Sequence, residues 1–168
     1  MKKNNNFTVV ICTFNRSHLI KNCLIKILEN NYIPSKVIIV DQNFNKLTSN
    51  ISKNVFKNYR FKNFKIIKNA IKPGLTVSKN ISLQHVKTKY VFFIDDDILL
   101  GKNFFKHIIN LIAKKKAHGV CGILSNYSNN KIKNFFYNLL NHGAFKDNRR
   151  YFLDYKNYIS KNITYKRI

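Results

Sequence analysis

The sequence predicts an α/β fold in which a doubly wound, mostly parallel sheet is sandwiched by helices. Short runs of β-branched and apolar residues without polar alternation recur along the chain, as in parallel strands that are buried on both faces. Stretches with helical periodicity stand between these runs. With 168 residues, 45% of them hydrophobic, the chain has the size of one domain with its own core. We therefore treat it as a single folding unit.

The first half of the chain contains three predicted strands, which cover residues 7–13, 37–40 and 64–68. Between the first two, apolar residues at i, i+1, i+4 and i+5 spacing predict an amphipathic helix that Ser17 caps and that ends near Asn30. Residues 44–63 are polar and irregular, so we expect at most a short helix there.

The second half continues the alternation. Pro73 and Gly74 mark a turn, because Pro restricts its own φ and Gly tolerates positive φ. The elements predicted after this turn are a helix over 75–86, a very hydrophobic strand over 90–94, a helix over 104–112 and a strand over 118–124 that two glycines weaken. Alternating strands and helices predict right-handed crossovers, with ligands bound beyond the carboxyl ends of the strands.

The charge balance is strongly basic. Lys and Arg number 31 against 7 Asp and Glu, for a net charge of +24. Such a field attracts nucleic acid, anionic lipid headgroups or phosphorylated substrates. A compositionally biased genome would produce the same excess, because Lys, Asn, Ile and Phe crowd every segment. Charge alone therefore does not identify a partner.

The cysteines and the hydropathy indicate a compartment. Cys12, Cys23 and Cys121 are odd in number and lack the paired C-x-x-C spacing of a structural zinc site, which is typical of thiols in a reducing compartment. No stretch approaches the roughly 20 apolar residues that cross a bilayer, and the apolar run after Met1 is too short for a signal peptide. We expect a cytoplasmic protein, with the inner face of the cytoplasmic membrane as a further location.

Polar side chains follow three of the predicted strands at the points where the strands end, namely Thr13 and Asn15, Asp41 to Asn43, and Asp95 to Asp97. Carboxyl ends of parallel strands meet at one edge of a sheet, so we expect these side chains to share a crevice. Three of the seven acids stand together in the last group.

Adjacent carboxylates about 4 Å apart repel by several kcal/mol at an intermediate dielectric, and a divalent cation would compensate them. Oxygen ligands favour Mg²⁺ or Mn²⁺, and Mg²⁺ completes its shell with water and substrate phosphates. Two structural alternatives stay open. Asp97 or a neighbour caps a helix that begins near Lys102, or nearby lysines neutralise the acids. Dinucleotide-binding G-x-G-x-x-G and P-loop motifs are missing from the sequence, which disfavours P-loop NTPases and ordinary dehydrogenases.

Three ordered motifs carry a family resemblance. They are TVVICTFNR at 8–16, VIIVDQN at 37–43, and KPGLTVSKN at 72–80 followed by the aspartates. The chain resembles the nucleotide-sugar-binding half of family 2 glycosyltransferases over about residues 7–125. The resemblance implies a GT-A fold, with residues 1–125 as the donor-binding region and 126–168 as the beginning of an incomplete acceptor region.

The resemblance also implies roles for individual acids. Asp95 to Asp97 match the D-x-D motif, in which Asp97 contacts the metal, with Asp95 as a second ligand, while Asp96 or Asp95 reaches the donor's ribose or a metal-bound water. Asp41 approaches the base, where a carboxylate can accept an N–H from a uracil or similar ring. Alternatively, Asp41 is simply a turn residue at the end of its strand and has no role in binding.

Further residues of the donor pocket follow from the same resemblance. Thr13, Asn15 and Arg16 line it. Gln42 stands where family members often carry a second acid, so an amide takes part in base recognition instead. Lys79 occupies a position that is commonly Arg and can reach the donor's phosphates, although a solvated lysine is an equally good interpretation.

The reaction that the resemblance implies is the metal-dependent transfer of a sugar from a nucleotide diphosphate sugar to a hydroxyl group, with inversion at the anomeric carbon. The implied acceptor is a saccharide or a lipid-linked molecule, and the implied role is cell-surface polysaccharide or lipopolysaccharide synthesis. Inversion requires a general base, which the family supplies from its carboxyl-terminal half. Beyond residue 125 the only acids are Asp147 and Asp154, and neither matches a family base motif. We therefore expect a truncated chain with weak or absent activity alone. A domain that works with a partner chain, and a compact enzyme that recruits Asp147 or Asp154 as the base, are the alternatives.

Two other function classes remain as alternatives. The first is a catalytically inactive nucleotide-sugar-binding fragment. The second is a basic nucleic-acid-binding protein that stacks bases on Tyr151, Phe152, Tyr155 and Tyr158. This alternative leaves the three aspartates unexplained, because they would repel phosphate. A basic surface is also compatible with peripheral association with an anionic membrane.

Overall fold

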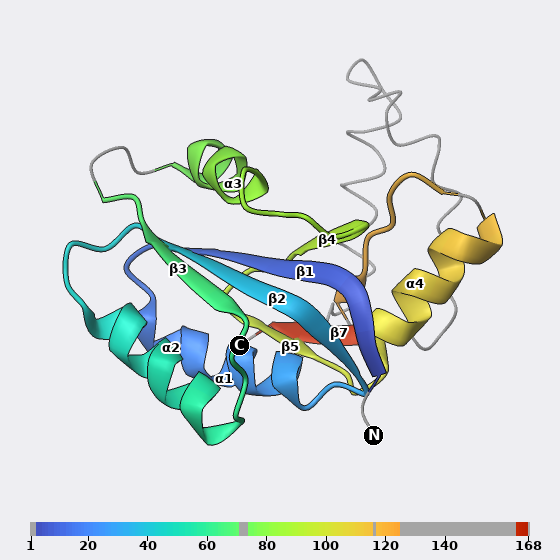
Figure 1. The fold of residues 1–168 in the computed structure, drawn as a ribbon, viewed down its shortest axis with the longest axis horizontal. Coiled ribbons are helices and arrows are strands. Elements are labelled where there is room, and N and C mark those ends of the chain that lie inside the picture. The colour runs from blue at the N-terminus through green and yellow to red at the C-terminus, as the bar shows by residue number, and fades with distance from the viewer. Residues whose placement is uncertain (1–2, 71–73, 116, 125–163, 168) are drawn as a thin grey trace, which may run out of the picture.

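The computed structural model describes residues 3–70, 74–115, 117–124 and 164–167. Within these residues the main sheet has four parallel strands in the order β3-β2-β1-β4 (Figure 1). The strands are β1 Lys3–Thr13, β2 Tyr32–Asp41, β3 Phe64–Lys68 and β4 Tyr90–Phe93. Strand β1 pairs with β2 on one side and with β4 on the other, so the order of the strands across the sheet reverses at β1.

The two central strands carry the apolar runs that predicted them. Val9 pairs with Val37 and Ile11 with Ile39, and all four side chains are completely buried. The β1–β2 register shifts between Asn5 and Thr8, opposite the part of β2 that contains Pro34. Pro has no N–H to donate to the ladder, so an irregularity at this point is expected.

Helices cover both faces of the sheet, as the sequence predicted. Helices α1 Ser17–Leu28 and α2 Leu47–Asn58 pack against each other on one face, while α3 Leu75–Leu83 lies on the other, against β1 and β2 (Figure 1). Helix α4 Phe104–Lys115 joins the core through Phe105, whose ring centroid lies 4.8 Å from that of Phe7 and 5.0 Å from that of Phe92.

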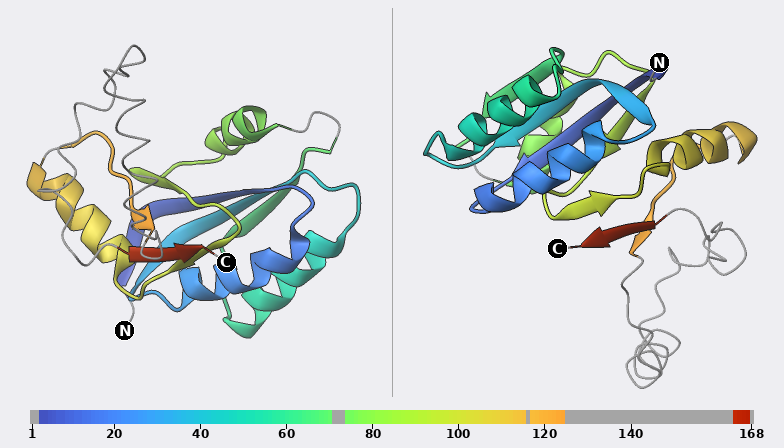
Figure 2. Two further views of the ribbon diagram at one scale, coloured as in Figure 1. Left: turned by 180° about the vertical axis from the view of Figure 1, so that it is seen from behind. Right: turned by 90° about the horizontal axis from the view of Figure 1, so that it is seen from below.

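A second, smaller sheet follows the acidic run. It consists of β5 Ile98–Leu100, β6 Ile123–Leu124 and β7 Thr164–Arg167, in the order β5-β7-β6. Strand β7 runs antiparallel to β5 and parallel to β6, and Figure 2 shows it beside β5 at the end of the coloured chain. Neither β5 nor β7 was predicted, because three and four residues are too few to show a period.

The prediction of at most a short helix within 44–63 was wrong, because α2 has twelve residues. Its buried positions are Thr48, Ser52, Val55 and Phe56, at helical spacing. Half of them are hydroxyl residues, so a pattern of apolar residues alone does not reveal the face.

Three smaller predictions also need correction. Ser17 does not cap α1. Arg16 precedes the helix without a side-chain cap, and Ser17 Oγ lies 2.8 Å from Thr48 Oγ1 of α2 instead. The strand expected over 118–124 is limited to Ile123–Leu124, and the helix expected to reach residue 86 ends at Leu83.

Among the described residues, no helix combines the length and apolar character that spanning a membrane requires.

Candidate functional site

The carboxyl ends of the parallel strands meet at one edge of the main sheet. Thr13 at the end of β1 pairs with Asp41 of β2, which in turn pairs with Lys68 of β3. On the other side of β1, the backbone N–H of Ile94 donates to the carbonyl oxygen of Val10 at 3.0 Å, so that Asp95 emerges at the same edge. The structure thereby brings together the three polar groups that follow the predicted strands.

The acidic run is buried except for its first member. Asp96 is completely buried and Asp97 is 4% exposed, whereas Asp95 is exposed. Arg16 lies against both buried acids, with one guanidinium nitrogen 3.1 Å from Asp96 Oδ1 and another 3.3 Å from Asp97 Oδ2. Arg16 is therefore a cation that lies next to both buried carboxylates.

The proposed capping role of the acids does not fit the structure. β5 begins directly after Asp97, and the first N–H of α4, at Phe104, donates to the carbonyl oxygen of Gly101 at 3.0 Å. Asp97 therefore lies too early in the chain to cap α4.

The environment of Asp96 disfavours its charged form. Burial raises the pKa of Asp96, the nearby hydroxyl of Thr13 and the charge of Arg16 lower that pKa, and the neighbouring carboxylates of Asp97 and Asp95 raise it again. Both carboxylate oxygens of Asp96 are shielded from solvent. A further cation at this place would offset the cost of keeping these carboxylates ionised.

These carboxylates suit a hard divalent cation, because all their ligand atoms are oxygens. Across the described ranges, no group of three or more His, Cys, Asp or Glu residues is arranged to hold a metal ion by itself. Mg²⁺ commonly takes one or two carboxylate ligands from a protein and the others from water and phosphate.

Asp41 is engaged within the protein. It is completely buried. Its Oδ1 accepts hydrogen bonds from the backbone N and the Nδ2 of Asn43, at 3.1 and 2.8 Å. Its Oδ2 lies 2.7 Å from Lys68 Nζ, which also donates to the carbonyl oxygens of Asn43, at 2.8 Å, and Asn45. The expected contact between Asp41 and a base would have to compete with these bonds.

Asn43 connects the loops that follow β1 and β2. Its Oδ1 accepts from the backbone N–H of Asn15 at 2.7 Å, and its Nδ2 donates to Thr48 Oγ1 at 3.1 Å. Asn15 has a φ of 55°, in the left-handed region that Asn tolerates better than most residues. The side chain of Asn43 thus holds the turn that presents Asn15 and Arg16.

A cavity of about 510 Å³ opens at this edge of the sheet. It is lined by Cys12, Phe14, Arg16, Gln42, Gly74, Leu75 and Asp95. Burial raises the pKa of the Cys12 thiol to about 11, partly opposed by the charge of Lys79. Lys79 itself lies with Nζ 5.2 Å from the centroid of the Phe93 ring, on the α3 side of the sheet. We name the cavity of about 510 Å³ described above the edge cavity.

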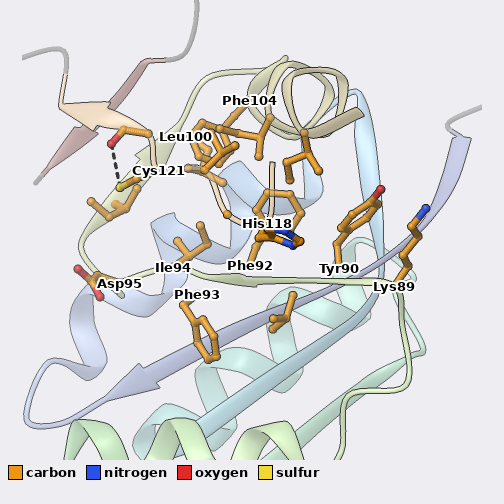
Figure 3. A pocket seen from close by; sticks show the side chains of 17 residues that line it. Lys89, Tyr90, Phe92, Phe93, Ile94, Asp95, Leu100, Phe104, His118 and Cys121 are labelled. Atoms are coloured by element: carbon orange, nitrogen blue, oxygen red, sulfur yellow. Dashed lines mark hydrogen bonds between the residues drawn. The ribbon is translucent and has the colours of Figure 1, made fainter. Parts of the chain in front are cut away.

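A second cavity, of about 450 Å³, lies between β4, α4 and residues 118–122. Figure 3 shows Phe92, Ile94, Leu100 and Phe104 pointing into it, with Asp95 at one end and Cys121 near β6. Asp95 is the residue that lines both of these cavities.

Sequence reasoning missed Lys68 and Gly74 and assigned Asn43 no role of its own. Lys68 is the last residue of β3, and it could have been found because polar residues at the carboxyl ends of parallel strands lie at one edge of the sheet. It was overlooked because it is one of 31 basic residues. The contact of Gly74 with Gln42 joins residues 32 apart and has no local signal. Asp147 and Asp154, the candidates for the general base, lie outside the described residues.

Comparison with known proteins agrees with this architecture. Residues 8–167 match the family model described as glycosyl transferase family 2. No curated protein sequence matches the chain.

Several solved structures are similar to the chain. One is the mannosyltransferase PcManGT from Pyrobaculum calidifontis in complex with GDP-Man and Mn²⁺, at 20% identity and a TM-score of 0.60, with 73% of this chain and 35% of that chain covered. Another is S. aureus TarS 1-349, at 20% identity and a TM-score of 0.61, with 72% and 36% covered; it has also been solved with UDP-GlcNAc.

A third similar structure is glucosyl-3-phosphoglycerate synthase from Mycobacterium tuberculosis with Mn²⁺, UDP and glucosyl-3-phosphoglycerate, at 15% identity and a TM-score of 0.51, with 64% and 39% covered. These likenesses show that the chain has a GT-A fold, and that it spans between 35% and 39% of the length of these three proteins.

Proposed function

Because the chain belongs to glycosyl transferase family 2, we propose that it binds a nucleotide diphosphate sugar in the edge cavity and that this sugar is transferred to a hydroxyl acceptor. The observation that carries the proposal is the pair of buried carboxylates, Asp96 and Asp97, beside Arg16 at the carboxyl edge of the sheet. Ligands of open α/β sheets bind at such an edge, where the strand order reverses.

We place Mg²⁺ or Mn²⁺ at Asp97, with Asp95 as a second ligand and Asp96 beside them. The support is the burial of two acids in a run of three, and the exclusively oxygen character of their ligand atoms. PcManGT with GDP-Man and Mn²⁺ adds support from a similar fold. When bound, such a metal would stabilise the negative charge of the departing nucleoside diphosphate.

The chain's own residues bind and orient the donor. Arg16 offers a guanidinium to the phosphates, since it is 43% exposed and already faces the acids. Lys79 adds a second positive charge from α3, where the ring of Phe93 holds its ammonium. Thr13 is buried at the end of β1, and Asn15 lies in the turn that presents Arg16, where its backbone N–H is bonded to Asn43; both are proposed to support the donor pocket from these positions.

The finer points of the proposal are inversion at the anomeric carbon, a saccharide or lipid-linked acceptor, and a role in polysaccharide or lipopolysaccharide synthesis. The net charge of +24 supports a substrate or surface that is anionic, including peripheral contact with an anionic membrane. Asp147 and Asp154 remain the candidates for the general base.

The test is calorimetric titration of UDP- and GDP-sugars into the chain, with and without Mn²⁺, on the wild type and on Asp97→Asn. We expect Mn²⁺-dependent binding that weakens at least tenfold in the variant. Glu29→Gln removes the same charge from an acid at the carboxyl end of α1 and serves as the matched control. Binding that needs no metal and is equal in all three proteins would disprove the site assignment.

A further inference from the structure

Eight large apolar side chains of the described residues are exposed, and half of them gather at the carboxyl edge of the main sheet. These four belong to the loops that follow β1 and β2 and to the first residues of α2 and α3. They are Phe14, Phe44, Leu47 and Leu75, which are 47%, 85%, 52% and 53% exposed. We name these four residues the apolar rim. A single exposed apolar residue is ordinary, but several at one place indicate a surface that meets another apolar molecule or phase.

The segments that carry the apolar rim are held together. Figure 1 shows the loops that follow β1 and β2 at the same end of the sheet. The side chain of Asn43, next to Phe44, accepts a hydrogen bond from the backbone N–H of Asn15 at 2.7 Å, and Asn15 directly follows Phe14. Phe14 and Leu75 both line the edge cavity. The four apolar side chains therefore belong to one surface.

The exposure of Phe44 is fixed by the hydrogen bonds of its neighbours. Lys68 Nζ donates to the carbonyl oxygens of Asn43, at 2.8 Å, and of Asn45. Asn45 Oδ1 accepts from the backbone N–H of Leu47 at 3.1 Å. Both residues next to Phe44 are thus anchored, while its own ring stays outside the core at 85% exposure. The ring remains in water unless a partner covers it.

The exposed charges around the apolar rim are mostly positive. Lys46 is exposed within the rim itself, and Arg16 and Lys68 are 43% and 41% exposed at the same edge. Exposed apolar side chains interspersed with cations match the interface of an anionic bilayer, which offers acyl chains to the former and headgroups to the latter. The acids at this edge are Asp41, Asp96 and Asp97, which are buried, and Asp95, which is exposed.

We propose that the apolar rim docks onto an anionic bilayer, with Phe44 and Leu47 among the acyl chains and Lys46 at the headgroups. Nucleic acid fits this surface less well, because the aliphatic Leu47 and Leu75 offer no flat face for stacking. Docked in this way, the chain holds the edge cavity in the headgroup layer, where a lipid-linked acceptor carries its polar group. This last point deepens the proposed function and rests on it, whereas the docking itself does not.

A rival surface for vesicles lies away from the apolar rim, near the amino end of β3. Lys36 Nζ donates to the carbonyl oxygen of His85 at 3.1 Å, and Lys65 Nζ lies 3.3 Å from His85 Nδ1. This basic group would hold the chain on an anionic vesicle by charge alone. Leu83, two residues before His85, is 45% exposed and lies at the opposite end of α3 from Leu75, so it can report on that surface.

The chain contains no tryptophan, so one substitution places a single fluorescent reporter at a chosen position. Phe44→Trp tests the apolar rim, and Leu83→Trp is the matched control. Each protein is mixed with vesicles of phosphatidylglycerol and phosphatidylcholine, or of phosphatidylcholine alone. On the anionic vesicles we expect the emission of Phe44→Trp to move to shorter wavelength and to be quenched by lipids with brominated acyl chains. The emission of Leu83→Trp should change little.

Removal of the apolar side chains tests the same surface without a reporter. The double variant with Phe44→Ser and Leu47→Ser should sediment with anionic vesicles at least about tenfold more weakly than the wild type, because two apolar side chains no longer leave water. Leu83→Ser removes an equally exposed side chain elsewhere and should bind vesicles as the wild type does. All three substituted side chains are exposed, so their loss leaves the core intact.

Several results would overturn the docking. The first is an unchanged emission of Phe44→Trp while the protein sediments with anionic vesicles, which would mean that another face makes the contact. The second is a wild type that does not bind these vesicles. The third is an emission of Phe44→Trp that shifts with protein concentration alone or with an oligonucleotide instead of vesicles, which would assign the rim to a second copy of the chain or to nucleic acid.

Donor binding separates this inference from the proposed function, since the described residues that line the edge cavity do not include Phe44 or Leu47. Calorimetry of UDP- and GDP-sugars with Mn²⁺, without vesicles, supplies that readout. A chain that binds a donor but no vesicles would overturn the docking and leave the proposed function standing. A chain whose Phe44→Trp variant inserts into vesicles, but which binds no donor, would overturn the proposed function and leave the docking standing.

Discussion

The guanidinium of Arg16 lies 3.1 Å from a carboxylate oxygen of the completely buried Asp96. The same guanidinium reaches Asp97 at 3.3 Å. An arginine from the loop after β1 therefore holds the acids that follow β4, across the point where the strand order of the sheet reverses.

Replacing Arg16 by Met should destabilise the chain in the absence of metal. The substitution leaves the buried Asp96 and Asp97 without this cation, at a cost of about 1–2 kcal/mol because Arg16 is partly exposed. Mn²⁺ should then stabilise Arg16→Met more than it stabilises the wild type, since it supplies the missing positive charge. Thermal unfolding with and without Mn²⁺ measures both effects.

Lys21→Met, on the exposed face of α1, is the control for loss of one positive charge. It should respond to Mn²⁺ as the wild type does. Equal metal-induced stabilisation of Arg16→Met and Lys21→Met would mean that Arg16 does not compensate the acids.

Replacing Asn43 by Ala should loosen the turn that follows β2. The change removes the side-chain bonds to Asp41, Thr48 and the backbone of Asn15, so that Asp41 Oδ1 keeps the bond from the backbone N–H of residue 43 and loses the bond from the side chain. We expect a loss of about 1–3 kcal/mol in the free energy of unfolding, measured by urea denaturation. Asn54→Ala, at an exposed position of α2, should be neutral or slightly stabilising. A loss no greater than that of Asn54→Ala would contradict the proposed role of Asn43.

Replacing Phe105 by Ala should be among the most damaging single changes in the core. Its ring is completely buried and contacts the rings of Phe7 and Phe92, with centroids 4.8 and 5.0 Å away. Truncation of a buried Phe costs about 3–5 kcal/mol through lost burial and the cavity left behind. Phe44→Ala removes the same ring from a side chain that is 85% exposed, and denaturation should show a change within about 0.5 kcal/mol.

The thiol of Cys12 should react slowly with alkylating reagents at pH 8. Burial raises its pKa to about 11, so the reactive thiolate is scarce at pH 8 and its fraction increases as the pH rises toward 11. Modification of a Cys121→Ser protein, followed by mass spectrometry, measures the rate at Cys12. UDP with Mn²⁺ should slow it further because Cys12 lines the edge cavity. A rate at pH 8 as fast as that of a free thiol would be at odds with the half-buried position of Cys12.

The parallel core could be predicted because its signal is local. Val37 to Val40 are all buried, and an uninterrupted apolar run of this kind has few other interpretations. The edge residues could be predicted too, since Thr13, Asp41 and Asp95 directly follow such runs or stand close behind them. Helix α2 was underestimated because Thr48 and Ser52 are buried on a face that carries few apolar residues.

The sequence by itself determined which segments form the core strands and which polar residues follow their carboxyl ends, because strand periodicity and strand ends are properties of neighbouring residues. The tertiary structure decided how these polar groups are used. It paired Arg16 with Asp96 over 80 positions of sequence, committed Asp41 to Asn43 and Lys68, and turned the amide of Gln42 by means of Gly74. Hydrogen bonds and ion pairs depend on distances of a few ångströms between segments that only folding brings together, so no local pattern encodes them.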